Sequence, residues 1–221
     1  YIQPAERSRT SGGTEVGSRF LVMTKAICKS LIDIEPELTQ CDTVCGDGDC
    51  GLVMKKGCQR ILADMHGYDM SSAGFCSCVA DSLSVSMGGT SGALFEIFFR
   101  AAANSLSSSK GGDEFVASVL ALQAGCRAIQ FYGGATTGMR TMLDALVPAV
   151  QKMTHFNPTA SIKERILDGA VAAKAGSDAT KNMEALAGRA NYVNSQLMDG
   201  VPDPGSLAVA TAFAAAASVY E

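Results

Sequence analysis

Three carboxylates crowd into one short stretch of this chain, Cys41-Asp42-Thr43-Val44-Cys45-Gly46-Asp47-Gly48-Asp49-Cys50-Gly51. Packed together in a folded site, Asp42, Asp47 and Asp49 would repel one another unless a cation lay between them. Oxygen ligands favour a hard ion such as Mg²⁺ or Ca²⁺, and Mg²⁺ usually binds together with phosphate. The glycines allow backbone N–H groups to approach that phosphate closely. This stretch, the acidic loop, predicts a metal-nucleotide site.

The acidic loop also matches two other motifs, and both fail on neighbouring residues. Gly46-x-Gly48-x-x-Gly51 has the dinucleotide fingerprint, but that motif needs a preceding buried strand and a phosphate loop without carboxylates. An EF-hand loop starting at Asp47 would need a bidentate Glu at its twelfth position, where the chain has Cys58. No P-loop motif (GxxxxGK followed by Ser or Thr) occurs. A surface turn in which Asp and Gly serve turn chemistry stays open as an alternative.

The composition favours one helical domain. With 221 residues and 47% hydrophobic content, the chain is long enough to bury a sizeable core. Aromatic residues make up only 6%, and the abundance of Ala, Leu, Val and Met suits helix-on-helix packing. A net charge of -4 without a basic run argues against nucleic acid or an anionic membrane as partner. No convincing transmembrane stretch or signal peptide is visible, so we expect a cytoplasmic protein.

Eight cysteines raise the question of a zinc site or a disulfide framework. Their spacing contains no CxxC pair, and the only histidines are His66 and His155, whereas zinc sites use tighter pairs. We therefore expect free thiols in a reducing compartment.

Apolar residues recur at the spacing of amphipathic helices through most of the chain. Pro36 is expected to end the first helix, and Thr141–Asp144 and Ser161–Glu164 have the spacing of capping boxes. The pattern predicts helices over residues 20–34, 53–65, 71–87, 90–99, 113–129, 141–150, 161–171, 177–187 and from 206 onward. No segment alternates like a strand, so we predict an all-α bundle or barrel of about eight antiparallel amphipathic helices.

The first residues differ in composition from the rest. Residues 3–17 are polar and rich in Ser, Gly, Arg and Thr, as linkers are. We expect residues 1–16 to be a linker from a missing upstream domain and residues 17–221 to form one domain.

Two connections besides the acidic loop carry groups that suit phosphate. Residues 87–92 place Thr90 and Ser91 at a helix start, where free N–H groups and the positive helix end favour an anion. An ordinary N-cap explains the same residues equally well. Residues 132–142 carry Arg140, whose planar fork matches phosphate oxygens; a solvent-facing ion pair is the alternative.

A third connection, residues 199–205, is a stiff turn in which two prolines hold Asp203 in one geometry. In an antiparallel bundle, alternate loops gather at one end. We therefore expect these three connections and the acidic loop to surround one nucleotide.

Five motifs in this order resemble the nucleotide-binding L domain of the dihydroxyacetone kinase family: D-x4-GDGDCG, MGGTSGAL, GxRTMLDAL, ATKNMEALAGRANYV and GVPDPG. The similarity runs from Gly17 to the C-terminus. It implies a closed barrel of eight antiparallel helices that binds ATP at one end through two Mg²⁺ ions. It also implies Asp42, Asp47 and Asp49 as the metal ligands.

The same resemblance implies which residues contact ATP. They are Asp47, Gly48, Asp49, Cys50, Thr90, Ser91, Gly133, Thr141, Met142, Asp203, Pro204 and Gly205. The first six would hold phosphates, the next three would line the nucleotide pocket, and the last three would close over it. Where the family commonly has Pro-Gly-Asp-Arg, this chain has Thr137-Gly138-Met139-Arg140. Arg140 is therefore only a candidate for stabilising phosphate charge.

The resemblance further implies that the carbonyl substrate binds covalently to a histidine of a separate K domain. Neither His66 nor His155 lies in a suitable context, so we expect no substrate-binding catalytic residue in this chain. Cys50, where separate bacterial subunits usually have His, is more similar to the single-chain, ATP-using type. That type implies a homodimer formed through the K domain, and an isolated L domain that is inactive.

The sequence therefore predicts transfer of the ATP γ-phosphoryl, with Mg²⁺, to dihydroxyacetone or a related triose held by the K domain. Three alternatives stay open. The chain could be an ADP-holding L subunit of a phosphotransferase-system kinase, or could take part in FAD-AMP lyase (FMN cyclase) activity. It could also be a non-catalytic helical scaffold whose acidic loop is structural.

Overall fold

The computed structural model describes residues 15–109, 112–154 and 160–220, and every regular element within these ranges is a helix. Four short 3-10 helices lie between the longer ones: η1 (Met65–Gly67), η2 (Thr180–Asn182), η3 (Arg189–Tyr192) and η4 (Ser195–Met198). The nine α-helices of the described ranges are α1 (Glu15–Asp33), α2 (Glu35–Cys45), α3 (Cys50–Asp64), α4 (Ser72–Ser86), α5 (Gly89–Ser108), α6 (Glu114–Gly133), α7 (Leu143–Thr154), α8 (Ile162–Ala179) and α9 (Pro204–Ser218).

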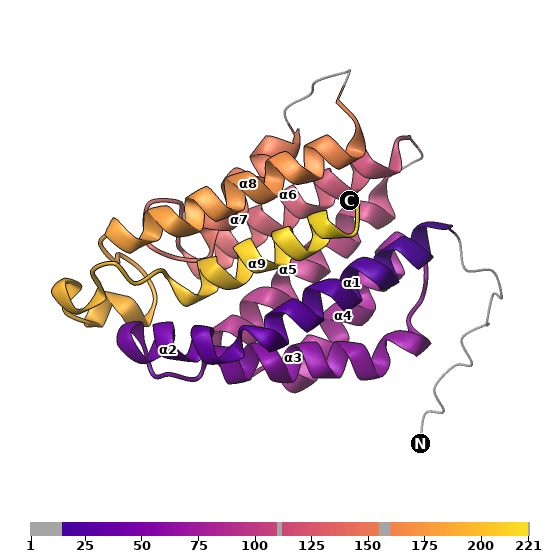
Figure 1. The fold of residues 1–221 in the computed structure, drawn as a ribbon. Helices are drawn as coiled ribbons and strands as arrows, with labels where there is room; N and C mark the ends of the chain where they lie inside the picture. Colours follow the sequence, from indigo (N-terminus) through magenta and orange to yellow (C-terminus); the bar gives the residue numbers. More distant parts are fainter. Residues whose placement is uncertain (1–14, 110–111, 155–159, 221) are drawn as a thin grey trace.

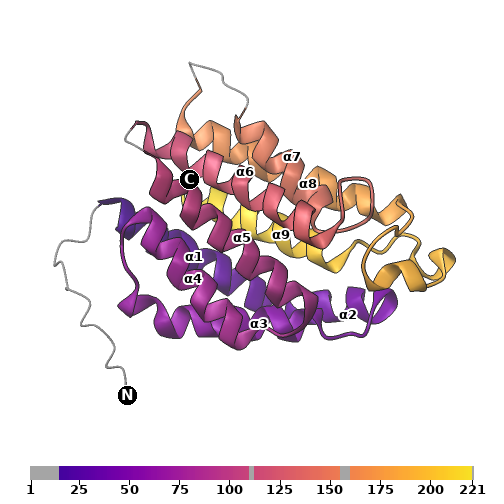
Figure 2. The same cartoon turned by 180° about the vertical axis from the view of Figure 1, so that it is seen from behind.

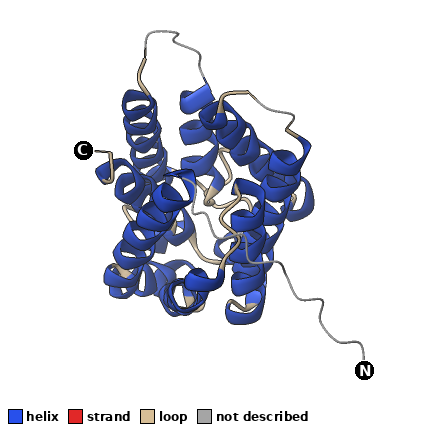
Figure 3. Cartoon of the chain, turned by 90° about the vertical axis from the view of Figure 1, so that its right-hand side faces the viewer, coloured by secondary structure: helices blue, strands red, loops and turns tan. Residues whose placement is uncertain are grey.

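Eight of these α-helices form a closed ring. The first helix, α1, contacts α3, each helix from α3 to α9 contacts the next, and α9 returns to contact α1. Neighbours in the ring run in opposite directions, as Figures 1 and 2 show from two sides. Figure 3 shows the helices arranged around a common interior. The remaining helix, α2, packs against α3 at one end of the ring. The prediction of an all-α closed barrel of antiparallel helices is confirmed.

The last helix, α9, joins the two halves of the core. One cluster of buried side chains, including Leu31 and Val79, combines α1, α3 and α4 with Ala208 of α9. A second cluster, including Phe98, combines α5, α6 and α7 with Val209 of α9. Burying one side chain of this kind contributes about 1.5–3 kcal/mol, so the alanine-rich α9 stabilises both sides of the barrel through its neighbours' larger groups.

Several helix starts use the caps that the sequence predicts. The Ser71 side chain accepts a hydrogen bond from the N–H of Gly74, and Asp113 caps the first turn of α6. Ser161 and Glu164 form a complete capping box at the start of α8, with each side chain accepting from the other's backbone. Such caps satisfy N–H groups that have no partner within the helix.

Three boundaries differ from the expectation. Pro36 lies in the first turn of α2, a helix that the sequence pattern did not indicate, because a first turn needs no N–H from proline. The helix predicted at 177–187 is wrong, since α8 continues to Ala179 and η2 follows. The first helix begins at Glu15, two residues before the expected domain start, and most of the expected linker lies outside the described residues.

Helices α7 and α8 approach closely at one glycine. Pro148 lies inside α7 and has no N–H, so the carbonyl of Asp144 lacks its usual partner in the helix. A Cβ atom at Gly176 of α8 would collide with this carbonyl oxygen and would lie 3.0 Å from the Cα of Ala145. Gly176 therefore allows the two backbones to touch.

We expect Gly176→Ala to destabilise the barrel although alanine is the better helix former. The collision involves backbone atoms that cannot rotate away, so the free energy of unfolding should fall on the order of 3 kcal/mol. Urea denaturation followed by circular dichroism measures this. Gly67→Ala is the control, because nothing lies within 4 Å of a Cβ there. Equal stability of the two variants would contradict the close contact.

One of the described helices, α6, is long and apolar enough to cross a membrane by length and composition. It is a member of the ring and contacts both α5 and α7. Core helices of globular proteins often have such a composition, so this property carries no further conclusion.

Candidate functional site

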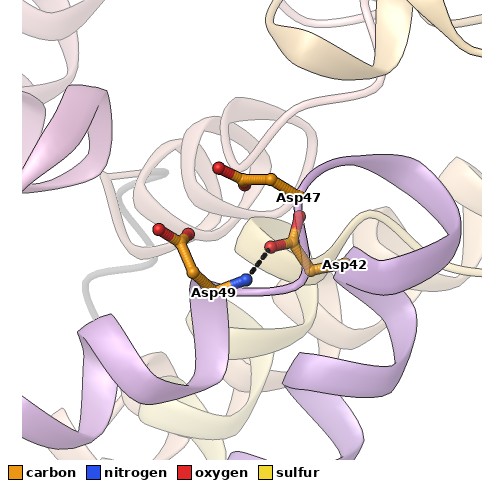
Figure 4. A group of neighbouring side chains, drawn as sticks. All are labelled: Asp42, Asp47 and Asp49. Atoms are coloured by element: carbon orange, nitrogen blue, oxygen red, sulfur yellow. Dashed lines mark hydrogen bonds between the residues drawn. The ribbon is translucent and has the colours of Figure 1, made fainter.

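The three carboxylates of the acidic loop converge where α2 ends and α3 begins. Asp42 comes from the last turn of α2, Asp47 from the turn between the helices, and Asp49 immediately precedes α3. One ligand oxygen from each lies within 4.8 Å of the others. Figure 4 shows the three side chains around one point. Carboxylate oxygens this close form the donor set that a hard divalent ion prefers.

Asp42 is fixed in place by the backbone of α3. Its side chain is 9% exposed, and its Oδ2 accepts hydrogen bonds from the N–H groups of Asp49 and Cys50, both at 2.9 Å. These N–H groups belong to the start of α3, which has no partner for them within the helix. Asp42 therefore both caps α3 and presents its second oxygen next to Asp47 and Asp49.

The carboxyl group of Asp49 lies in a negatively charged environment. Burial first, then the charges of Asp47 and Asp42, raise the pKa of the Asp49 carboxyl above its usual value. Repulsion of this kind disappears when a cation lies among the carboxylates. The residues present therefore fit a bound divalent ion.

Cys50 is not a suitable thiolate ligand. Burial, followed by the charges of Asp42, Asp203 and Asp49, raises the pKa of its thiol to about 12. The side chain is therefore neutral at physiological pH, and the donor set consists of hard oxygens. Its contribution to the site is the backbone N–H that Asp42 accepts.

Arg189 is a site residue that the sequence analysis did not identify. It begins η3, which carries it across the end of the barrel, and its Nη1 forms an ion pair with Oδ2 of Asp47. Both side chains are largely exposed, so the pair itself contributes little stability. The sequence signal that could have identified Arg189 is its motif, GRANYV. In the structure, the glycine of this motif has a φ of 70°.

The four connections expected to meet do lie at one end of the barrel. The acidic loop, the start of α5, the loop after α6 and the segment before α9 are found at the left end in Figure 1 and the right end in Figure 2. Thr90 and Ser91 lie in the first turn of α5, and Gly133 packs toward Leu94 of that helix. No hydrogen bond among the described residues joins Thr90 or Ser91 to the carboxylates.

A second group of predicted residues meets at the starts of α7 and α9. A Cβ at Gly205 would lie 3.2 Å from the Cβ of Met142, so these two segments touch. The N–H of the neighbouring Thr141 donates to Asp144 at 2.8 Å. Asp203 caps α9 by accepting from the N–H of Ser206 at 2.7 Å, and Pro204, which is buried, follows it as the first residue of α9.

Arg140 is buried, whereas the sequence analysis considered a phosphate contact or a solvent-facing ion pair. Its side chain is 1% exposed, and it donates to the carbonyl oxygens of Thr180 and Val201 and to the sulfur of Cys45. The guanidinium therefore lies inside the protein, beneath the end of the barrel. The sequence pattern could not distinguish a buried arginine in this loop from an exposed one.

Neither histidine was expected to bind substrate, and the one that the structure describes lies away from the acidic loop. His66 belongs to η1, at the far end of α3 from the acidic loop, and is exposed. His155 lies outside the described residues.

The carboxyl group of Asp203, at this end of the barrel, has a raised pKa. Burial raises its pKa to about 7, and the charges of Asp144 and Asp42 add to the rise. The N–H of Ser206 and the charge of Arg140 act in the opposite direction.

We expect stability to depend on pH through Asp203. Folding raises its pKa from 3.8 to about 7, so the folded state keeps a proton that the unfolded chain releases. This contribution is complete below pH 3.8 and is lost as the pH rises toward 7. The loss is on the order of 4 kcal/mol, because one pKa unit corresponds to about 1.4 kcal/mol.

Asp203→Asn should remove this pH dependence, since an amide oxygen can still accept from Ser206 but cannot titrate. Urea denaturation between pH 4 and pH 8, without metal, should show a flatter profile for the variant than for the wild type. Identical profiles would contradict the raised pKa.

These features define the class of the protein as a closed helical barrel with a cluster of three carboxylates at one end that could hold a metal ion. The family model described as the DAK2 domain matches residues 44–218. The chain belongs to the DAK2 domain family.

Relatives of known name support the same assignment. The triokinase/FMN cyclase of Rattus norvegicus is 36% identical over 223 residues, which cover 99% of this chain and 38% of that protein. The dihydroxyacetone kinase of Pichia angusta is 32% identical over 231 residues, covering 98% and 37%. The chain thus spans well under half the length of these relatives.

Two solved structures share the fold. The native dihydroxyacetone kinase of C. freundii aligns with a TM-score of 0.76 and 28% identity over 99% of this chain and 38% of that one. The same enzyme in complex with AMP-PNP and Mg²⁺ aligns with a TM-score of 0.72 and 29% identity, covering 99% and 37%.

Proposed function

We propose that this chain is the ATP-binding domain of a dihydroxyacetone (glycerone) kinase. It would provide the γ-phosphoryl group of ATP to dihydroxyacetone or a related triose held by a separate K domain of the same protein. The observation that carries this proposal is the convergence of three carboxylate oxygens within 4.8 Å at the end of the barrel. The structural relative crystallised with AMP-PNP and Mg²⁺ supports it.

Asp42, Asp47 and Asp49 would hold Mg²⁺ in this function. The bound ions would neutralise negative charge on the phosphate oxygens, which is a large part of phosphoryl-transfer catalysis. Asp42 is the best anchored of the three, because two backbone N–H groups fix its orientation. We assign no general-base role to these carboxylates.

The remaining residues would orient the nucleotide. Thr90 and Ser91 offer hydroxyl groups and the positive end of α5 to the phosphates. The other proposed contacts follow from the order of the loops around this end: Gly48, Cys50, Gly133, Thr141, Met142, Asp203, Pro204 and Gly205. The contact between Met142 and Gly205 supports a pocket wall made jointly by the starts of α7 and α9.

Arg189 is a further candidate for phosphate binding. Its ion pair with Asp47 shows that the guanidinium reaches the metal carboxylates. Since Asp47 would bind metal, the same arginine could turn to a phosphate oxygen, for which its planar fork is well suited.

A second candidate function has its own support. Relatives with 34–36% identity are named triokinase/FMN cyclase, so FMN cyclase activity is the alternative to test. Incubating the full-length protein with FAD and divalent metal, followed by chromatography for a cyclic flavin phosphate, decides it.

Titration calorimetry with ATP, with and without Mg²⁺, tests the main proposal. The wild-type chain should bind Mg-ATP, and Asp47→Ala should lose that binding while its helical circular dichroism stays unchanged. Asp47 is exposed and caps no helix, so its removal should leave stability within about 0.5 kcal/mol. Unchanged ATP affinity in this variant would defeat the proposal.

Adding a separately prepared K domain and measuring triose phosphorylation then tests the reaction.

A further inference from the structure

Arg140 has three unusual properties, and it lies beneath the end of the barrel that carries the proposed nucleotide site. It is 1% exposed, and among the described residues it is the one non-glycine with a positive φ, 58°. A left-handed backbone is unfavourable for a residue with a Cβ and persists only where the surroundings enforce it. Its Nη1 has no hydrogen-bond partner within the described part of the chain. These features are costly for stability, which points to another role.

The guanidinium links three segments that are distant in sequence. Nε donates to the carbonyl of Thr180 at 3.2 Å, where α8 has just ended. Nη2 donates to the carbonyl of Val201 at 2.8 Å, in the turn before α9, and to Sγ of Cys45 at 3.2 Å, the last residue of α2. Arg140 itself lies in the loop between α6 and α7.

Each of these segments carries part of the proposed nucleotide site. Cys45 follows Asp42 by three residues and precedes Asp47 by two. Val201 precedes Asp203 by two residues, and Oγ1 of Thr180 accepts the N–H of Asp203 at 2.9 Å. The metal carboxylates and the turn that would close over the nucleotide are therefore tied to one buried side chain.

We propose that Arg140 is a positioning residue that holds the end of α2 at a fixed position relative to the turn at 201–205. In this way the three aspartates and the turn that would close over the nucleotide keep a fixed separation. Arg140 itself would contact neither the metal nor the nucleotide. This inference rests on the proposed function, because it assigns both parts to one nucleotide site. Rigid placement matters there, since small displacements of groups that orient reactants cost much of the rate.

Cys45 allows this link to be cut without removing the buried charge. Cys45→Ala deletes the only acceptor on α2 that Arg140 uses in the described chain, and leaves both carbonyl contacts in place. Cys45→Ser restores an acceptor. Cys126→Ala is the matched control, because Cys126 is also buried, at 5% exposure, but belongs to the α5–α6–α7 cluster.

The experiment measures Mg-ATP affinity by calorimetry and stability by urea denaturation for these three variants and the wild type. Both alanine variants should lose stability through the deleted sulfur. Only Cys45→Ala should weaken Mg-ATP affinity, by roughly tenfold or more, as expected when support of a metal ligand is removed. Cys45→Ser should recover most of that affinity. Equal Mg-ATP affinity of Cys45→Ala and Cys126→Ala would overturn the positioning role.

Hydrogen exchange separates this inference from the proposed function. If wild-type chain binds no Mg-ATP, the proposed function fails, and exchange of the amides at residues 43–49 still tests the link. Faster exchange there in Cys45→Ala but not in Cys126→Ala supports positioning by Arg140. Unchanged exchange in both variants overturns it.

Discussion

Asp42→Ala is expected to abolish Mg-ATP binding and to destabilise the barrel at the same time. The change removes one proposed metal ligand and leaves the N–H groups of Asp49 and Cys50 without their acceptor. Losing two hydrogen bonds to a charged group should lower the free energy of unfolding by roughly 3 kcal/mol. Mg-ATP affinity should fall at least roughly 100-fold, because even residues that only support metal ligands have effects of 10–100-fold.

Asp42→Asn separates the two roles of this side chain. The amide oxygen can still accept both N–H groups, and the loss of charge relieves repulsion with Asp47 and Asp49. Its stability should therefore stay within about 1 kcal/mol of the wild type, whereas Mg-ATP binding should be lost as in the alanine variant. Calorimetry and urea denaturation measure both quantities.

Asp113→Ala provides the control for capping alone. Asp113 caps α6 through two N–H groups, as Asp42 caps α3, but it lies outside the acidic loop. It should lose about 1 kcal/mol of stability and keep its affinity for Mg-ATP. Wild-type affinity in Asp42→Asn would rule out Asp42 as a metal ligand, and wild-type stability in Asp42→Ala would rule out its capping role.

Gly51→Ala should impair both stability and Mg-ATP binding, through geometry instead of charge. Gly51 lies in the first turn of α3, and a Cβ there would collide with the carbonyl oxygen of Glu35 and with Thr39 of α2. These are backbone atoms and a packed hydroxyl, so the start of α3 would have to move away from α2. Asp49 and Cys50 would move with it, away from the carboxylate of Asp42.

We therefore expect Gly51→Ala to lower both stability, by about 2–3 kcal/mol, and Mg-ATP affinity. Gly125→Ala in the middle of α6 is the comparison, because its Cβ would collide with the Phe98 ring without disturbing the acidic loop. It should be destabilised but bind Mg-ATP normally. If Gly51→Ala binds Mg-ATP as tightly as Gly125→Ala does, the close approach of α2 and α3 is not needed for the site.

Helical periodicity and capping residues predicted most of the fold, and their success has a local cause. A cap such as Ser161 with Glu164 acts within one turn, so its spacing alone identifies it. The helix α2 was missed because Pro36 stops one helix and equally well starts the next. The closure of the ring was expected only from the family resemblance, since contact between α1 and α9 leaves no periodic signal.

The candidate site was predictable where chemistry is concentrated in one loop and much less so where it depends on distant segments. The three carboxylates of the acidic loop lie close together in the structure, as their short spacing in the sequence indicated. The burial of Arg140 depends on Thr180, Val201 and Cys45, none of which is near it in sequence. The approach of Arg189 to Asp47 likewise joins residues far apart in the chain.

The contact between α1 and α9 has a consequence for how the protein folds. We expect the barrel to stay open during synthesis until α9 has left the ribosome, because the contact that closes the ring joins its first and last helices. Contacts of such long sequence separation form late and slow the final step of folding. The turn at 203–205 emerges together with that helix, so a nucleotide bound there would stabilise only the closed barrel and shift the folding equilibrium toward it.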